Sequence, residues 1–215
     1  ELRTEAVVGT QIIINGGKII EVKAAGCATG TSVEVRQLFF NLPARRKFLR
    51  SEETEFAHIQ HYLTLAALAY PEVAFTFLKD TRIVWQLPAQ KIDVTASQQS
   101  ATDTSPEKNE QLHSAEAQRR TTALRERMRA LLGGDLKLLS VDFTGELPSS
   151  ENLEGESENS SFRLWGFIGA PGVSRSTRED QHLFVNRRPV ENRGLNFALL
   201  EGYHTALMKG RYPVG

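Results

Sequence analysis

The sequence has a single cysteine, Cys27, and no long apolar run, and each absence excludes a class of protein. One cysteine cannot form an internal disulfide, nor can it supply a zinc site that needs several thiolates. No apolar stretch approaches the roughly 20 residues that a helix needs to cross a bilayer. The first residues also lack the basic and then apolar pattern of a secretory signal. We therefore expect a protein of the cytoplasm, or of the nucleus in a eukaryote.

An excess of charge is missing as well, because 26 Lys and Arg residues balance 26 Asp and Glu residues. This balance argues against a uniformly basic nucleic-acid-binding protein, so any contact with a polyanion has to come from a local patch. The length of 215 residues and the hydrophobic content of 40 % are typical of a globular protein with one large or two small domains.

The chain does not begin with Met, and its first strands favour a cut end. Apolar, mostly β-branched residues lie on both sides of Asn15, Gly16 and Gly17, a pattern that predicts a β-hairpin because Asn and Gly tolerate positive φ. A domain rarely begins in the middle of a sheet. We therefore interpret Glu1 as a cut end rather than a natural amino terminus.

The most distinctive stretch, residues 30–49, joins a predicted strand to a basic loop. It begins with Gly30 and Thr31, continues with Val33 and Val35 alternating with charged residues, and ends in a Pro-interrupted loop. A run of cations is usually a solvated surface, but the fixed spacing here favours a functional motif. The motif residues of this loop are Asn41, Pro43, Ala44, Arg45, Lys47 and Phe48.

A long helix is predicted after this loop. Ser51 can cap it, acidic residues occupy its first turn, and Pro71 cannot continue it. Its apolar residues recur at spacings of three and four, which predicts an amphipathic helix packed on a sheet. His58 and His61 lie three apart on this helix, but no third ligand is evident at a matching step. We therefore predict no metal site.

A second hairpin is predicted over residues 73–87, and the composition changes after it. Residues 88–118 contain almost no large apolar residue, so this segment cannot bury enough surface to offset its ordering entropy. We predict a flexible inter-domain linker or an insertion over residues 91–118.

Order is predicted to return at Thr122, where a helix with an apolar stripe runs to a glycine pair. The arginines of this helix, among them Arg127, are predicted to point away from the stripe. Strands are predicted over residues 136–143 and 162–168. The acidic, Ser-rich segment between them, residues 145–160, would repel a polyanion.

A second distinctive stretch covers residues 169–193. A Gly-Ala-Pro-Gly turn and a basic Ser/Thr loop lead to a strand that ends in Phe-Val-Asn-x-Arg, and a helix is predicted from Asn192. Guanidinium groups suit phosphate oxygens, although each arginine here could equally be a surface ion-pair partner. The candidate phosphate ligands are Arg178, Arg187, Arg188 and Arg193.

Together, the two distinctive stretches resemble the MutL family of DNA mismatch-repair proteins. The resemblance implies an α+β chain in which residues 1–90 are the C-terminal part of a Bergerat (GHKL) ATPase α/β sandwich. It implies that residues 119–215 are a truncated α/β domain similar to ribosomal protein S5 domain 2, after the linker or insertion at residues 91–118. It also implies ATP and Mg²⁺ as cofactors, and DNA and a MutS-like mismatch-recognition protein as partners. ATP binding would close two copies into a homodimer.

The resemblance also assigns roles to residues, and the sequence departs from the family pattern at several points. Gly30 and Thr31 match the fourth nucleotide motif and would lie by the adenine pocket, whereas the alternative for Thr31 is an ordinary strand-start residue. The four arginines match the basic groove for DNA. The general-base Glu, the magnesium-binding Asn, the adenine-site Asp and the phosphate-binding Lys are not among the residues of this chain. We therefore predict no catalytic residue here, although the intact family hydrolyses ATP.

Other classes of protein remain as alternatives. The nucleotide-binding and transducer region of a type II topoisomerase shares both folds in the same order, but it lacks the motif of residues 41–49. An RNA-binding module like ribosomal protein S5 would need a basic excess that the zero net charge denies. A Ser/His/Asp hydrolase is disfavoured because no serine lies at a strand-to-helix nucleophile elbow.

Overall fold

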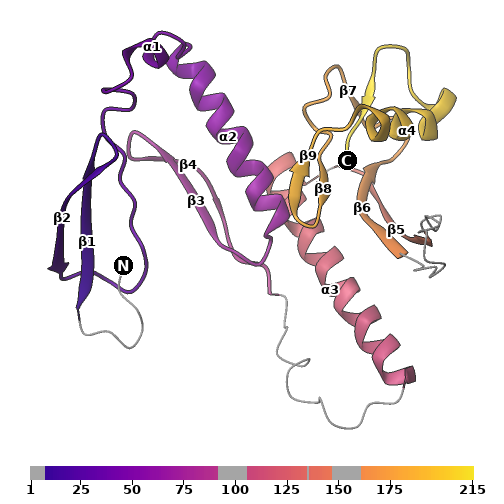
Figure 1. Cartoon of the computed structure of the whole chain (residues 1–215). Helices are drawn as coiled ribbons and strands as arrows, with labels where there is room; N and C mark the ends of the chain where they lie inside the picture. Colours follow the sequence, from indigo (N-terminus) through magenta and orange to yellow (C-terminus); the bar gives the residue numbers. More distant parts are fainter. Residues whose placement is uncertain (1–7, 92–105, 135, 147–160) are drawn as a thin grey trace, which may run out of the picture. The chain divides into compact units, whose positions relative to one another are not determined.

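The computed structural model describes residues 8–91, 106–134, 136–146 and 161–215 (Figure 1). The chain divides into two compact units, residues 1–59 and 60–215. This division falls inside a helix rather than at residue 90, so the predicted partition into residues 1–90, 91–118 and 119–215 stays a prediction. Within the described ranges, no helix combines the length and the apolar character that a membrane span requires.

The first unit opens with an antiparallel hairpin. Strands β1 (Gly9–Asn15) and β2 (Lys18–Ala25) pair along their whole length, with one irregularity of register between Ile13 and Ile14. Gly16 and Gly17 form the turn at φ values of 58° and 87°, a conformation that glycine adopts without strain. The predicted first hairpin is therefore confirmed.

The prediction of a strand at the start of the distinctive stretch, over residues 31–36, is wrong. Residues 31–36 form no strand, and Val33 and Val35 are 82 % and 73 % exposed. Alternation of apolar and charged residues indicates a face that could be buried. A strand also needs a hydrogen-bonded neighbour, and no described strand pairs with these residues.

Two helices follow, α1 (Pro43–Arg46) and α2 (Glu52–Ala69). Proline occupies the first turn of α1, where its missing N–H costs nothing. The Oγ of Ser51 accepts a hydrogen bond from the backbone N–H of Thr54 at 3.3 Å, so the predicted cap of α2 is confirmed. Only its C-terminal half is buried, at Leu65, Ala67 and Leu68, so the predicted packing of the whole apolar stripe on a sheet is not seen.

The second hairpin is also confirmed, as strands β3 (Phe75–Lys79) and β4 (Arg82–Leu87). Asp80 and Thr81 form its turn with φ values of 47° and 66°. Helix α3 runs from Pro106 to Leu132, so it begins well before Thr122 and overlaps the predicted linker. The rest of that linker, residues 92–105, lies outside the described residues.

The remainder of the second unit consists of paired strands and a helix. The two strands predicted over residues 136–143 and 162–168 are confirmed as β5 (Leu138–Glu146) and β6 (Ser161–Gly169), which pair with each other. Residues 147–160 of the acidic segment between them lie outside the described residues. Short strands β8 (Leu183–Val185) and β9 (Arg188–Val190) form a third hairpin. The other elements are β7 (Ser174–Arg175), α4 (Arg193–Tyr203), the 3-10 turn η1 (His204–Ala206) and β10 (Tyr212–Pro213), which pairs with β7.

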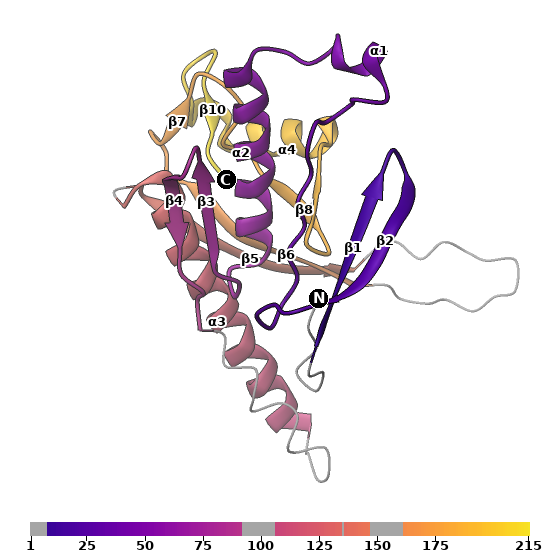
Figure 2. The ribbon, with the colours of Figure 1, turned by 90° about the vertical axis from the view of Figure 1, so that its left-hand side faces the viewer.

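The core of the second unit lies where α2, α3 and β6 meet. Leu68, Met128 and Phe167 are buried together, one from each of these elements. The base of the β3–β4 hairpin also meets α3, where the guanidinium of Arg127 lies 5.7 Å from the centre of the Phe75 ring, and Figure 2 shows the C-terminal end of α2 near α3. Partly buried apolar residues complete this core: Leu124, Leu131, Leu132, Leu138 and Phe184. Because Phe184 belongs to β8, the core holds the hairpin that carries two of the predicted DNA-binding arginines, Arg187 and Arg188.

Candidate nucleic-acid interface

The predicted nucleotide residues, Gly30 and Thr31, belong to the first unit. Gly30 has a φ of 132°, a value that side chains other than hydrogen rarely permit. A Cβ atom at this position would meet nothing within 4 Å, so the backbone conformation and not crowding demands glycine. Thr31 is exposed. Their role at an adenine pocket stays a prediction.

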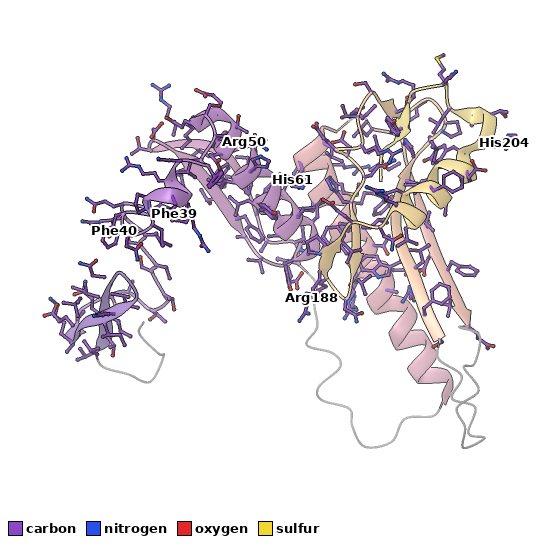
Figure 3. The ribbon with its side chains drawn as sticks, turned by 45° about the horizontal axis from the view of Figure 1, so that its top comes forward. Phe39, Phe40, Arg50, His61, Arg188 and His204 are labelled. Carbon is purple, nitrogen blue, oxygen red and sulfur yellow. The ribbon has the colours of Figure 1, made fainter. Side chains whose placement is uncertain are left out.

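The loop motif encloses a small hollow of about 270 Å³, lined by Phe39, Arg45, Phe48 and Leu49. Phe39 reaches this position through a left-handed backbone, with a φ of 63°. The aromatic ring of Phe48 is 83 % exposed, and Figure 3 shows Phe39 and Phe40 on the same loop. The sequence motif therefore forms a compact basic and aromatic turn. The hollow at this turn is not lined by Thr31.

The four predicted arginines of the second unit occupy three different settings. Asn186 and Arg187 form the turn between β8 and β9, with φ values of 50° and 65°, and Arg188 is the first residue of β9. Arg193 is the first residue of α4, just after β9. Arg178 lies on the loop before β8, where its guanidinium stacks on the ring of Tyr212 at 4.7 Å. The structure therefore brings Arg187 and Arg188 together at one turn and places Arg178 on another loop.

Arg187 is already engaged with other side chains. Its Nη1 donates to a carboxylate oxygen of Glu72 in a short ion pair, and its guanidinium lies 5.3 Å from the centre of the Tyr70 ring. A DNA phosphate would have to compete with both partners. Of the two roles open to Arg187, ion-pair partner is the one that the structure supports.

Arg188 and Arg193 are exposed, and neither makes an ion pair within the described parts of the chain. Figure 3 shows the side chain of Arg188 on the outside of the β8–β9 hairpin. Asn192 caps α4 through its side-chain oxygen, which accepts from the backbone N–H of Leu195 at 3.0 Å, and this cap fixes the start of the helix at Arg193. These two guanidinium groups therefore stand on two consecutive elements, Arg188 at the start of β9 and Arg193 at the start of α4.

One arginine of the second unit, Arg127, is buried, contrary to the sequence prediction. Arg127 on α3 is fully buried, and its Nη2 donates to the carbonyls of Pro71 at 2.8 Å, Val73 at 2.7 Å and Pro88 at 3.0 Å. Burial lowers the pKa of Arg127, and the nearby carboxylate of Glu72 opposes that shift. Arg127 thus ties α3 to the end of α2 and to the end of β4.

The spacing of the sequence contained a signal for this burial. Arg127 falls three residues after Leu124 and four before Leu131, on the side of α3 that carries the apolar stripe. The prediction that it points away from the stripe was wrong. A charged residue at a stripe position can be buried when backbone carbonyls accept its hydrogen bonds, as those of Pro71, Val73 and Pro88 do here.

Of the two histidines three residues apart on α2, His58 is exposed and His61 lies near a third histidine, His182. The ring of His61 lies 6.2 Å from that of His182, which is half-buried. Burial lowers the pKa of His182, the neighbouring His61 adds to this shift, and Asp180 opposes it. Among the residues that the structure describes, no group of three or more His, Cys, Asp or Glu side chains could hold a metal ion.

The sequence of this chain is similar to those of known proteins. Residues 142–215 match the family model described as DNA mismatch repair protein, C-terminal domain. The chain is 38 % identical over 208 residues to the DNA mismatch repair protein MutL of Opitutus terrae, covering 96 % of this chain and 26 % of that protein. It is 34 % identical over 212 residues to the MutL of Syntrophotalea carbinolica, covering 98 % and 27 %. The chain therefore spans about a quarter of the length of the curated relatives it matches.

Solved structures agree with this result. The Aquifex aeolicus MutL ATPase domain complexed with ADP is similar with a TM-score of 0.56 and 26 % identity, covering 92 % of this chain and 59 % of that one. A further crystal structure of the Aquifex aeolicus ATPase domain matches at a TM-score of 0.57 and 23 % identity, covering 96 % and 62 %. The predicted α+β fold class is confirmed.

Proposed function

Because this chain belongs to the MutL family of DNA mismatch-repair proteins, we propose that it is the DNA-contacting part of a protein that couples mismatch recognition to repair. In this proposal the whole protein binds ATP with Mg²⁺, closes into a homodimer and receives its signal from a MutS-like partner. It acts in the cytoplasm, or in the nucleus of a eukaryote. The observation that carries the DNA role is the pair of exposed arginines, Arg188 and Arg193.

The physical argument for DNA contact rests on unpaired charge. A guanidinium that already pairs with a carboxylate gains little from a phosphate, because the old pair must break first. Arg188 and Arg193 have no such pair within the described residues, whereas Arg187 has Glu72. The first two can therefore neutralise phosphates at low cost. Neither reads a base in this proposal, so binding has no sequence preference.

The nucleotide role of Gly30 and Thr31 is a separate proposal. One structural relative is complexed with ADP, and the family motif assigns these two residues to the adenine pocket. The positive φ of Gly30 favours glycine at this position. Because glycine has no Cβ atom, a ligand can approach the backbone closely here. Thr31 adds a hydroxyl that can donate to or accept from a base edge.

The DNA role is tested by fluorescence anisotropy with labelled oligonucleotides of unrelated sequence at low salt. The variants Arg188→Glu and Arg193→Glu should weaken binding to every sequence alike. Arg82→Glu is a matched control, because Arg82 is also the exposed first residue after a two-residue hairpin turn, in β4. Equal affinity of the wild type, Arg188→Glu and Arg193→Glu would show that these arginines are not DNA ligands.

A further inference from the structure

A second candidate site lies beyond the arginine pair, at the C-terminal end of α4. After Tyr203 the chain turns through η1 and returns to β10, and the space enclosed by this return is a hollow of about 510 Å³. Pockets that hold small ligands are of this order of size. Figure 3 shows His204 at this end of α4. Of the four arginines predicted to bind DNA, Arg178 lines this hollow, and the proposed DNA role rests on two others, Arg188 and Arg193.

Its lining combines apolar side chains with one strongly exposed methionine. Leu200 comes from α4, Leu207 and Met208 come from the return segment, and Tyr212 comes from β10. Met208 is 83 % exposed. Methionine is flexible and polarizable, and it is common at surfaces that accommodate apolar partners. The hollow can therefore take an apolar side chain from another molecule.

The rim is basic. Arg178, Lys209 and Arg211 line it, against a single carboxylate from Glu201. Arg178 is held over the ring of Tyr212 at 4.7 Å. This stacking fixes the guanidinium in place while its edge N–H groups stay available for an acceptor.

The return segment is also fastened to the rest of the unit. Arg211 donates to the backbone carbonyl of Ser174 at 2.8 Å and to the Oγ of Ser174 at 3.2 Å. The backbone N–H of Arg211 donates to the carbonyl of Met208 at 3.1 Å. The hollow therefore has walls that are positioned before any ligand arrives, which lowers the entropic cost of binding.

We propose that this hollow docks an acidic peptide segment of a partner protein, with one apolar side chain inserted against Leu207 and Met208 and carboxylates facing the basic rim. The excess of cations over the single Glu201 selects an anionic partner. The apolar lining selects a peptide over a nucleic acid, because phosphodiesters would gain nothing from Leu200, Leu207 and Met208.

The test uses the 215-residue chain and three labelled short peptides. One alternates Glu with Leu, one replaces each Glu by Gln, and one replaces each Glu by Lys. Anisotropy should show binding of the Glu peptide, weaker binding of the Gln peptide and none of the Lys peptide. Removing one exposed charge pair should weaken the Glu peptide by up to about fivefold. We therefore expect about that loss or more for Lys209→Glu, which also adds repulsion.

Met208→Ser should weaken the Glu peptide as well. Because Met208 is so exposed, this variant should fold like the wild type, which circular dichroism can verify. Lys91→Glu is the charge-matched control, since Lys91 is an exposed lysine that does not line the hollow. Equal binding of the three peptides, or unchanged affinity in both Lys209→Glu and Met208→Ser, would overturn the proposal. Loss of DNA binding in these two variants, with no loss of peptide binding, would assign the hollow to nucleic acid instead.

Discussion

Replacing the buried Arg127 should destabilise the second unit more than replacing any exposed arginine of the same helix. Its Nη2 donates to three carbonyls that lie far from α3 in sequence, those of Pro71, Val73 and Pro88. The carbonyl of Pro71 keeps a second donor, the backbone N–H of Gln90 at 2.9 Å. The other two lose their charged donor in Arg127→Ala.

The magnitude follows from these contacts. A buried polar group that loses its partner costs about 1–3 kcal/mol, and two carbonyls, those of Val73 and Pro88, lose their charged donor here. We expect Arg127→Ala to lower the free energy of unfolding by about 2–6 kcal/mol. Arg127→Met should cost less, about 1–3 kcal/mol, because it refills the space and removes a desolvated charge whose Nε and Nη1 have no hydrogen-bond partner.

Urea unfolding followed by circular dichroism measures both changes, provided that the slope with denaturant stays constant. Arg129→Ala is the control, since Arg129 is exposed and, within the described residues, its ion pair is with Glu126 on the same helix, at 2.8 Å. Its loss should stay within about 0.5 kcal/mol. A change below about 1 kcal/mol for Arg127→Ala would refute the view that this residue joins α3 to the ends of α2 and β4.

Three further predictions concern charge, pH and turnover. Glu72→Gln should strengthen DNA binding by a few-fold, because it frees Arg187 from its ion pair, and anisotropy showing weaker or unchanged binding would contradict this. Burial lowers the pKa of His182 below its ordinary value of 6.5, so the unfolded chain binds this proton more tightly than the folded chain does. The free energy of unfolding should therefore fall as the pH drops below about 6.5. The variant His182→Gln should flatten that fall in thermal unfolding between roughly pH 7 and pH 5, and an unchanged slope would argue against this origin. The purified 215-residue chain should not hydrolyse ATP above background, and steady turnover abolished by Thr31→Ala would contradict this.

Local turn chemistry made two hairpins predictable from the sequence. Gly16 and Gly17 supply positive φ directly, and the β3–β4 turn lies between two clear apolar runs. The β8–β9 hairpin was missed because its strands have three residues each, too few to show an apolar run on both sides of the turn at Asn186 and Arg187. Asn tolerates the left-handed region, and the rest of the turn is stabilised by the contact of Arg187 with Glu72, which is distant in sequence.

Three features differ from the sequence prediction: the start of α3, the strand at Val33 and Val35, and the role of Arg187. Polar composition suggested a linker up to residue 118, but α3 begins at Pro106, which shows that helix formation there does not depend on large apolar residues. The alternation at Val33 and Val35 indicated a strand, but pairing is a property of neighbours that a local pattern does not contain. The sequence pattern predicts the same DNA-binding role for Arg187 and Arg188. The two differ in the structure because Arg187 contacts Glu72 and Tyr70, which are distant from it in sequence.

The salt dependence of DNA binding tests the central claim most directly. Each phosphate contact contributes roughly 0.9 to the slope of log affinity against log salt on duplex DNA, or roughly 0.7 on single strands. Arg188→Ala and Arg193→Ala should each flatten the duplex slope by about one contact, on every sequence alike. Arg187→Ala and the control Arg82→Ala should leave it unchanged. Slopes that are the same for the wild type, Arg188→Ala and Arg193→Ala would contradict the assignment of this surface to DNA.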